Sequence, residues 1–198
     1  RVHPEHRRRE HGRHLLTSLS QKLAILGPPR LVAEVPAERE AACATFSACG
    51  WTIESRLTDW SRRIAPASSA AQGARAALAP VIFEDLEAAD LLGAGTRCWQ
   101  RDLPALAKHR ERLSGLAFHS PDRIEAWALW EAPGTLWAAG AAPGPFGRIG
   151  LSVVLDEIGA PLHLARATPE ELDADLLAEL GFERGAEHLL FTSQAQAA

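Results

Sequence analysis

The chain has 198 residues, of which 46% are hydrophobic and 23% charged, and its formal net charge is -4. This apolar content is ample for one large domain or two small ones. The ordinary charge excludes a global electrostatic attraction to nucleic acid or to an anionic membrane. Positive charge is concentrated at the front: residues 1–14 hold five Arg against two Glu, a net of +3, so any polyanion is expected to bind there.

The cysteines and the apolar segments point to a cytoplasmic protein. Three cysteines, Cys43, Cys49 and Cys98, make an odd number without CxxC spacing, which argues against a disulfide framework and against a zinc ribbon. No apolar run approaches the roughly 18 residues of a membrane span. The charged N-terminal segment also lacks the apolar core of a signal peptide. We therefore expect no membrane partner.

The first 60 residues predict a helix, a strand, a second helix and a second strand. Leucines at helical spacing follow Gly12 as far as Leu26, and Gly27-Pro28-Pro29 ends that helix. The alternating segment 30–35 predicts a strand, and Pro36 closes it. Segment 37–50 predicts a helix with Phe46 on its apolar stripe. Gly50 ends this helix, and an extended segment runs from Trp51 toward Trp60.

Residues 147–191 repeat this order of elements. A helix opens at Gly147-Arg148, the segment 162–167 is a strand, Pro169 begins a second helix, and Gly181-Phe182 leads into a strand. Gly147, Pro169 and Gly181 match Gly12, Pro36 and Gly50 at offsets of 135, 133 and 131 residues. Agreement in the positions of these glycines and prolines, and in the type and order of the elements, predicts an internal repeat.

The second copy has material in front of it that the first copy lacks. Segments 115–119, 123–130 and 135–141 predict strands, and 101–113 predicts a helix. A helix-strand-helix-strand fragment alone has no complete sheet to pack against. We therefore expect residues 1–65 to be the back half of a first domain, with about 65 to 80 further residues encoded before Arg1. Residues 66–79, rich in Ala and Ser, are predicted to be a linker, and residues 80–198 a second domain.

The segment Val2 to Leu16, VHPEHRRREHGRHLL, resembles the phosphate-binding turn of the GNAT acyltransferase superfamily. Members show a strand end, a Pro, an Arg-rich turn of the form Arg/Gln-x-x-Gly-x-Gly/Ala and a Leu-rich helix. The later Gly-aromatic pairs Gly50-Trp51 and Gly181-Phe182 also resemble the family. The resemblance implies an α/β (α+β) fold with a mixed central sheet flanked by helices, in two related units.

The resemblance also implies the cofactor and its site. Backbone N–H groups at a helix N-terminus, aided by the helix dipole and by arginines, bind a pyrophosphate. In this family the pyrophosphate belongs to coenzyme A, so acetyl-CoA is the expected acyl donor. The pantetheine arm would run between a strand ending at Val2 and a strand formed by Leu31 to Val35. The expected cofactor-binding residues are Val2, Arg7, Arg8, Arg9, His11, Gly12 and Arg13.

Two departures from the family pattern concern the turn. Glu10 stands where the first glycine is expected, and we predict that its carboxylate turns outward to pair with Arg7 or Arg13. The second copy has Gly147 and Gly150 but no arginine before them. We therefore predict that the second domain is more structural than catalytic.

By resemblance, the reaction is direct attack of a primary amine, on a small molecule or a peptide, on the thioester of acetyl-CoA. The chain contains no Tyr to protonate the departing thiolate; Phe46 and Leu177 stand at the approximate places. Glu34 is the only local candidate base, with an exposed strand glutamate as the simpler interpretation, so no catalytic residue is assigned. The alternative function is a non-catalytic acyl-CoA-binding or dimerisation module, and a homodimer is left open.

Three other patterns suggest competing interpretations. His3, His6, His11 and His14 suggest a metal, but their spacing matches no diagnostic ligand pattern, so no metal is predicted. Arg7 to Arg9 suggest a basic arm for nucleic acid, but aromatic residues are not interleaved, so no nucleic-acid partner is expected. Trp127 and Trp130, three apart in a predicted strand, should face opposite sides of the sheet, so that one of them can line a cleft.

Overall fold

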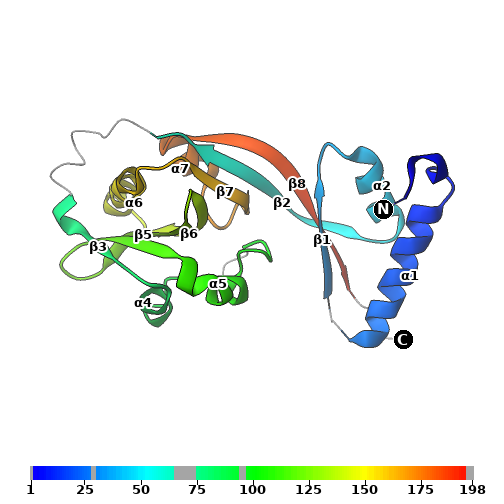
Figure 1. Cartoon of the computed structure of the whole chain (residues 1–198), viewed down its shortest axis with the longest axis horizontal. Coiled ribbons are helices and arrows are strands. Elements are labelled where there is room, and N and C mark those ends of the chain that lie inside the picture. Colours follow the sequence, from blue (N-terminus) through cyan, green and yellow to red (C-terminus); the bar gives the residue numbers. More distant parts are fainter. Residues whose placement is uncertain (1, 28–29, 65–74, 94–96, 195–198) are drawn as a thin grey trace. The chain divides into compact units, whose positions relative to one another are not determined.

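The computed structural model describes residues 2–27, 30–64, 75–93 and 97–194, which form two compact units (Figure 1). Unit 1 consists of Arg1–Leu57 and Ala186–Ala198, and unit 2 of Thr58–Gly185. Two long strands, β2 (Thr52–Arg62) and β8 (Phe182–Gln194), belong partly to each unit. None of the helices in the described ranges combines the length and the apolar character that crossing a bilayer requires.

Unit 1 contains the predicted helix-strand-helix-strand series. In chain order its elements before β2 are the 3-10 helix η1 (Pro4–His6), α1 (His11–Leu26), β1 (Arg30–Pro36) and α2 (Glu40–Ala48). Strand β1 pairs antiparallel with the end of β8, from Pro36 opposite His188 to Arg30 opposite Gln194. One face of this pair packs on the helices through a small core of Val35, Trp51, Leu189 and Phe191, with Leu16, Cys43, Phe46 and Cys49 at its edge.

In the described part of the chain, unit 2 contains the remaining strands, four α-helices and two 3-10 helices. Its elements are η2 (Arg75–Ala77), β3 (Leu78–Pro80), α4 (Phe83–Ala88), α5 (Leu103–His109), η3 (Arg110–Arg112), β4 (Ser114–His119), β5 (Ile124–Glu131), β6 (Thr135–Ala141), α6 (Pro145–Ile158), β7 (Leu162–Ala167) and α7 (Ala174–Glu179). The strand order of the whole sheet is β1-β8-β2-β7-β6-β5-β4-β3, with β6 and β7 parallel. The expected α/β fold with a mixed sheet flanked by helices is confirmed.

The sheet of unit 2 is buried on both faces, because α6 and α7 cover one face and α4 and α5 the other (Figure 1). The middle of strand β5, residues 126–130, is therefore apolar on both faces: Ala126 and Ala128 join the core beneath α6, while Trp127 and Leu129 join the core beneath α4 and α5. Trp130 packs against the first of these cores, so the predicted opposite orientation of Trp127 and Trp130 is confirmed.

The last strand of each predicted copy pairs with the first strand of the other copy. The end of β2 pairs antiparallel with β7, with Trp60 opposite Leu164, just as the end of β8 pairs antiparallel with β1. The matched elements α1 and α6, β1 and β7, α2 and α7, and β2 and β8 run in the same order. Descent of the two segments from one repeated unit, and the domain limits drawn from it, stay predictions.

The structure corrects one detail of the sequence analysis, the start of α7, and two further details stay untested. Helix α7 begins at Ala174 and not at Pro169, because the Asp173 carboxylate accepts hydrogen bonds from the N–H groups of Asp175 and Leu176 and caps the helix there. Val2 lies just before η1, and the strand that it is expected to end would precede Arg1, so that expectation stays a prediction. Most of the predicted linker lies outside the described residues, and its last two residues belong to β3, which pairs with β4.

Candidate functional site

The Arg-rich turn of unit 1 leads directly into α1. His11 is the first helical residue, and Glu10 before it has a left-handed backbone with φ of 60°. Arg8 has φ of 58°. Residues other than glycine adopt this conformation at a cost, because Cβ approaches the following carbonyl oxygen. Glu10 thus occupies, with a strained backbone, the place where the resembled pattern has its first glycine.

The side chains of this turn leave the start of the helix open. Arg7, Arg8 and Arg9 are exposed. Arg13 Nη1 lies 3.6 Å from Glu10 Oε2, and both side chains are more than half exposed, so the predicted outward pairing of Glu10 is confirmed. A Cβ built on Gly12 would have its nearest neighbours at 3.9 Å, so packing within the protein does not require glycine there.

A hollow of about 450 Å³ lies beside the turn, lined by Val2, Leu15 and the four histidines His3, His6, His11 and His14. The rings of His3 and His6 lie 6.0 Å apart, and those of His6 and His11 6.3 Å. Within the described ranges, no group of three or more His, Cys, Asp or Glu side chains is placed to hold a metal ion. The structure thus brings together Val2 and His11 of the predicted set, with Gly12 and Arg13 on the same first turn of α1.

The candidate base Glu34 lies on β1, half-buried, on the face of the strand opposite Val35. The register of β1 with β8 places His188 on that same face, opposite Pro36. His188 is 7% exposed, and its Nδ1 has no hydrogen-bond partner among the described residues. Sequence reasoning overlooked His188 because its burial depends on strand pairing between segments about 150 residues apart.

The corresponding helix start in unit 2 is built differently. Gly144 is the N-cap of α6, and the turn directly before Gly147, residues 142–146, contains no arginine. A Cβ on Gly147 would lie 2.0 Å from the carbonyl oxygen of Ala142, and one on Gly150 would lie 2.7 Å from Phe118. Close packing of α6 on its own unit therefore requires both glycines, and neither needs a phosphate to explain it.

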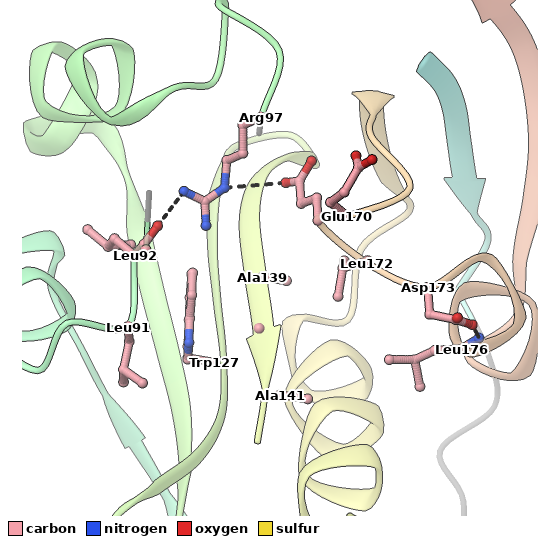
Figure 2. A pocket seen from close by; sticks show the side chains of 13 residues that line it. Leu91, Leu92, Arg97, Trp127, Ala139, Ala141, Glu170, Leu172, Asp173 and Leu176 are labelled. Atoms are coloured by element: carbon pink, nitrogen blue, oxygen red, sulfur yellow. Dashed lines mark hydrogen bonds and ion pairs between the residues drawn. The ribbon is translucent and has the colours of Figure 1, made fainter. Parts of the chain in front are cut away.

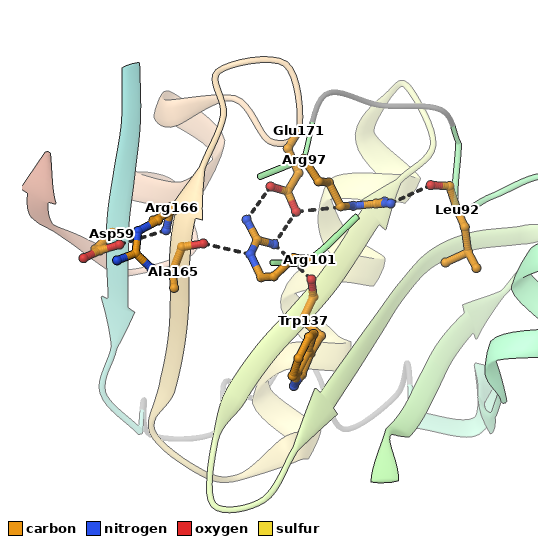
Figure 3. Close-up of polar contacts among 8 residues, drawn as sticks. All are labelled: Asp59, Leu92, Arg97, Arg101, Trp137, Ala165, Arg166 and Glu171. Atoms are coloured by element: carbon orange, nitrogen blue, oxygen red, sulfur yellow. Dashed lines mark hydrogen bonds and ion pairs between the residues drawn. The ribbon is translucent and has the colours of Figure 1, made fainter. Parts of the chain in front are cut away.

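A buried arginine lies between the parallel strands β6 and β7 of unit 2 (Figure 3). The strands pair at Thr135 and His163, near where both begin. Two residues further along each strand, Arg101 Nη1 donates to Trp137 O at 2.9 Å and Arg101 Nε donates to Ala165 O at 2.7 Å. The guanidinium thus joins the strands at the level where sheet hydrogen bonds would otherwise run.

A single carboxylate, Glu171, balances this arginine and a second one. Arg101 Nη1 and Nη2 donate to the two carboxylate oxygens at 2.6 and 2.7 Å, while Arg97 Nε lies 3.5 Å from Oε1. Burial alone would lower the pKa of Arg101, but the hydrogen bonds and charge of Glu171 raise it above its usual value. Burial lowers the pKa of Arg97, and the nearby charge of Arg101 adds to this effect against the opposing charge of Glu171.

Sequence analysis did not single out Arg97, Arg101 or Glu171. Arg101 and Glu171 are 70 residues apart, and each stands at the start of a segment that the sequence predicts to be a helix, where charged side chains are usually solvated. What distinguishes these three residues from surface charges is their burial. That burial depends on the packing of β6, β7 and the loop before α5, so it cannot be inferred from the local sequence.

Comparison with known proteins identifies the fold through solved structures. No protein-family model matches the chain, and neither does any curated protein sequence. Among solved structures, a GCN5-related N-acetyltransferase (GNAT) from Sphaerobacter thermophilus aligns with a TM-score of 0.66 at 14% identity, over 100% of this chain and 72% of that one. A second one, from Kribbella flavida, aligns with a TM-score of 0.53 at 18% identity, over 82% of this chain and 68% of that one. The chain therefore has the fold of the GNAT acyltransferases.

Proposed function

We propose that the chain binds acyl-CoA at the turn formed by Arg7 to Arg13, and that the protein transfers the acyl group, most simply acetyl, to a primary amine. The observation that carries the proposal is the open start of α1. Exposed arginines precede it, and the first turn of the helix contains a glycine, Gly12, that packing does not require. A glycine in a helix costs about 0.5–1 kcal/mol relative to alanine, and close approach of a ligand to the backbone would explain it.

Each group of the turn has a defined part in this binding. The first N–H groups of α1 have no partner within the helix and point at the pyrophosphate, where the helix dipole favours negative charge. Arg7, Arg8, Arg9 and Arg13 supply charge-assisted hydrogen bonds to its oxygens. Val2 and His11 border the adjacent hollow, which offers space for the parts of coenzyme A next to the pyrophosphate.

The transfer step balances without a further co-reactant. The neutral amine nitrogen attacks the thioester carbonyl carbon, the C–S bond breaks, and the thiolate of CoA leaves and is protonated. Glu34 is the local carboxylate that can accept the amine proton. Since the chain has no Tyr, the thiolate is protonated by solvent or by another group.

Calorimetric titration of the intact protein with acetyl-CoA tests the binding. Arg7→Ala with Arg9→Ala should weaken binding about 10- to 100-fold, since each arginine contributes charge-assisted hydrogen bonds. The matched control is Arg110→Ala with Arg112→Ala, which removes two arginines that are 52% and 65% exposed in unit 2. Equal loss in both double variants, or no heat with the intact protein, would rule the site out.

The second candidate function is a non-catalytic acyl-CoA-binding or dimerisation module. Two observations favour it: the chain has no Tyr, and Arg101 fills the space between β6 and β7 in unit 2. Product analysis by mass spectrometry, with acetyl-CoA and a mixture of primary amines, separates the two functions. Binding of acetyl-CoA without release of free CoA thiol would favour the module.

A further inference from the structure

The hollow beside the Arg-rich turn of unit 1 is walled mainly by histidines. Its volume of about 450 Å³ is within the range of sites that hold small molecules. Of the six described residues that line it, two are apolar and four are imidazoles from η1, its N-cap and the first turn of α1: His3, His6, His11 and His14. Because an imidazole changes its charge between about pH 5 and 8, this wall becomes positive as the pH falls.

The first turn of α1 carries cationic residue types where a helix favours anions. It contains His11, Arg13 and His14 and no acidic residue. The N-terminal end of a helix has a partial positive charge, so cations there destabilise it. Glu10 precedes the helix, but its side chain makes no capping hydrogen bond and lies 3.6 Å from Arg13. A bound anion would offset this accumulation of positive charge.

The groups around the hollow add positive charge and do not neutralise it. Three exposed arginines lie between η1 and α1, and residues 1–33 contain only two acidic residues, Glu5 and Glu10. The side chain of Glu5 is 82% exposed and lies 3.9 Å from His3, so water screens its charge. From α2, the side chains placed against this part of α1 are those of Thr45 and Cys49, and neither is a carboxylate.

The hollow differs in charge from the pocket of unit 2 that Figure 2 shows. That pocket has a volume of about 300 Å³, and Glu170, Glu171 and Asp173 line it. Its one arginine, Arg97, is already paired with Glu171. Among the described residues, those that line the hollow of unit 1 include no carboxylate. An anion is therefore expected in the hollow and not in the pocket of unit 2.

The spacing of the imidazole rings suits an anion with several oxygens. The ring of His6 lies 6.0 Å from that of His3 and 6.3 Å from that of His11. A phosphate monoester has three terminal oxygens, and each accepts a charge-assisted hydrogen bond of about 2.7–2.9 Å. One such group beside His6 can therefore accept hydrogen bonds from more than one protonated ring.

We propose that this hollow binds a phosphate monoester through the protonated imidazoles of His3, His6 and His11, and that in acyl-CoA this group is the 3′-phosphate. The inference rests on the proposed function, because the 3′-phosphate and the pyrophosphate of CoA are attached to the same ribose. The imidazoles take up protons as the dianion binds, so the affinity for acyl-CoA rises as the pH falls from about 8 toward 6. The rise ends where the phosphate monoester itself gains a proton, near a pKa of about 6.

The test is a calorimetric titration of the full chain with acetyl-CoA and with acetyl-dephospho-CoA, which lacks only the 3′-phosphate. At about pH 7 acetyl-CoA should bind about tenfold more tightly. Titrations in two buffers of different ionisation enthalpy should show an uptake of about 0.5–1 proton with acetyl-CoA and less with the dephospho compound.

The outcomes separate this inference from the proposed function. Equal affinities, or no proton uptake with acetyl-CoA, would overturn the inference and leave the proposed function standing. No binding of either compound would overturn both. Inorganic phosphate, titrated alone, separates the two sources of the same chemistry: binding as tight as that of acetyl-CoA would mean that the hollow serves free phosphate, and would overturn the assignment to acyl-CoA.

Variants then assign the contact to the histidines. His3→Gln with His6→Gln should reduce the preference for acetyl-CoA over the dephospho compound to within about threefold and lower the proton uptake, while the affinity for acetyl-dephospho-CoA stays unchanged. The matched control is His109→Gln with His163→Gln, which removes two histidines of unit 2 that line neither the hollow nor the pocket. An equal preference for acetyl-CoA in both double variants would contradict the assignment.

Discussion

The starts of α1 and α6 occupy matching places in the two predicted copies, yet they differ in exposure and in the packing around their glycines. The start of α1 is open and charged: its arginines are exposed, and a Cβ on Gly12 would meet only ordinary van der Waals contacts at 3.9 Å. The start of α6 is closed, since Gly147 is held against Ala142 O. The same sequence signal, a glycine at the start of a helix, thus has a packing cause in unit 2 and no packing cause in unit 1, where the proposed pyrophosphate contact would supply one.

The arginines of the two units differ in the same way. Those of the turn in unit 1 are in solvent, where their removal changes stability little. Arg101 in unit 2 is 4% exposed as a side chain and bonds two strands and a carboxylate. The arginines of the turn are thus accessible to a ligand, whereas the guanidinium of Arg101 is buried and bonded to residues of its own unit.

The largest effect expected from this contrast is that of Arg101→Met. It deprives Trp137 O, Ala165 O and the Glu171 carboxylate of their donor, and we expect a loss of about 3–5 kcal/mol in the free energy of unfolding. Arg7→Ala is the control and should cost less than about 0.5 kcal/mol. Urea unfolding followed by circular dichroism measures both, and a loss below about 1 kcal/mol for Arg101→Met would show that Arg101 does not hold the strands.

Gly147→Ala should have the next largest effect. A methyl group 2.0 Å from the backbone oxygen of Ala142 forces α6 to shift, at an expected cost of about 2–3 kcal/mol, the range for overpacking. The measurement is the midpoint of thermal unfolding, compared with the Gly12→Ala variant of the matching helix. An unchanged midpoint would mean that α6 can move aside, and the packing account of Gly147 would be wrong.

Much of the fold could be predicted from the sequence because its elements have strong local signals. Leucines at helical spacing and the following Gly27 locate α1, and Gly147-Arg148 locates the start of α6, which begins at Pro145; Gly27 and Gly159 both end their helices with positive φ. The start of α7 could not be predicted in the same way, because Pro169 and Asp173 both resemble a helix start, and only the hydrogen bonds to the Asp173 carboxylate distinguish them.

The candidate sites were predictable to different degrees. The turn of unit 1 is continuous along the chain, so the sequence alone is enough to name its arginines and Gly12. The group of Arg97, Arg101 and Glu171 comes from two loops that meet only when the sheet forms, and charged residues in loops are usually solvated. Local patterns therefore led to the turn of unit 1, whose role in binding stays a prediction, but not to the buried charged group of unit 2.

Gly12→Ala separates stability from binding in the open turn. Alanine is the better helix former and fits the available space, so the free energy of unfolding should rise by about 0.5–1 kcal/mol. If the pyrophosphate of CoA approaches this backbone, its affinity should fall about tenfold in the same variant, because the methyl group holds it away. Calorimetry and urea unfolding on one preparation test both, and unchanged CoA affinity would contradict close approach.

The smallest expected effect concerns Glu10, the residue that departs from the resembled pattern. Its carboxylate pairs with Arg13 at 3.6 Å in an exposed setting, so this ion pair stabilises the fold by less than about 1 kcal/mol. Near a bound pyrophosphate the same charge is repulsive, by about 0.7 kcal/mol for unit charges at 6 Å in water. Glu10→Gln should therefore tighten CoA binding about threefold at low salt, and the gain should fade at high salt.

Glu10→Gly adds a backbone effect to this charge effect. Glycine relieves the cost of φ at 60° but gains freedom in the unfolded chain, so stability should stay within about 0.5 kcal/mol. If both variants bind CoA more tightly, the carboxylate is a repulsive neighbour of the ligand. If both bind it more weakly, Glu10 instead orders Arg13 for binding, and the departure from glycine is then part of the site.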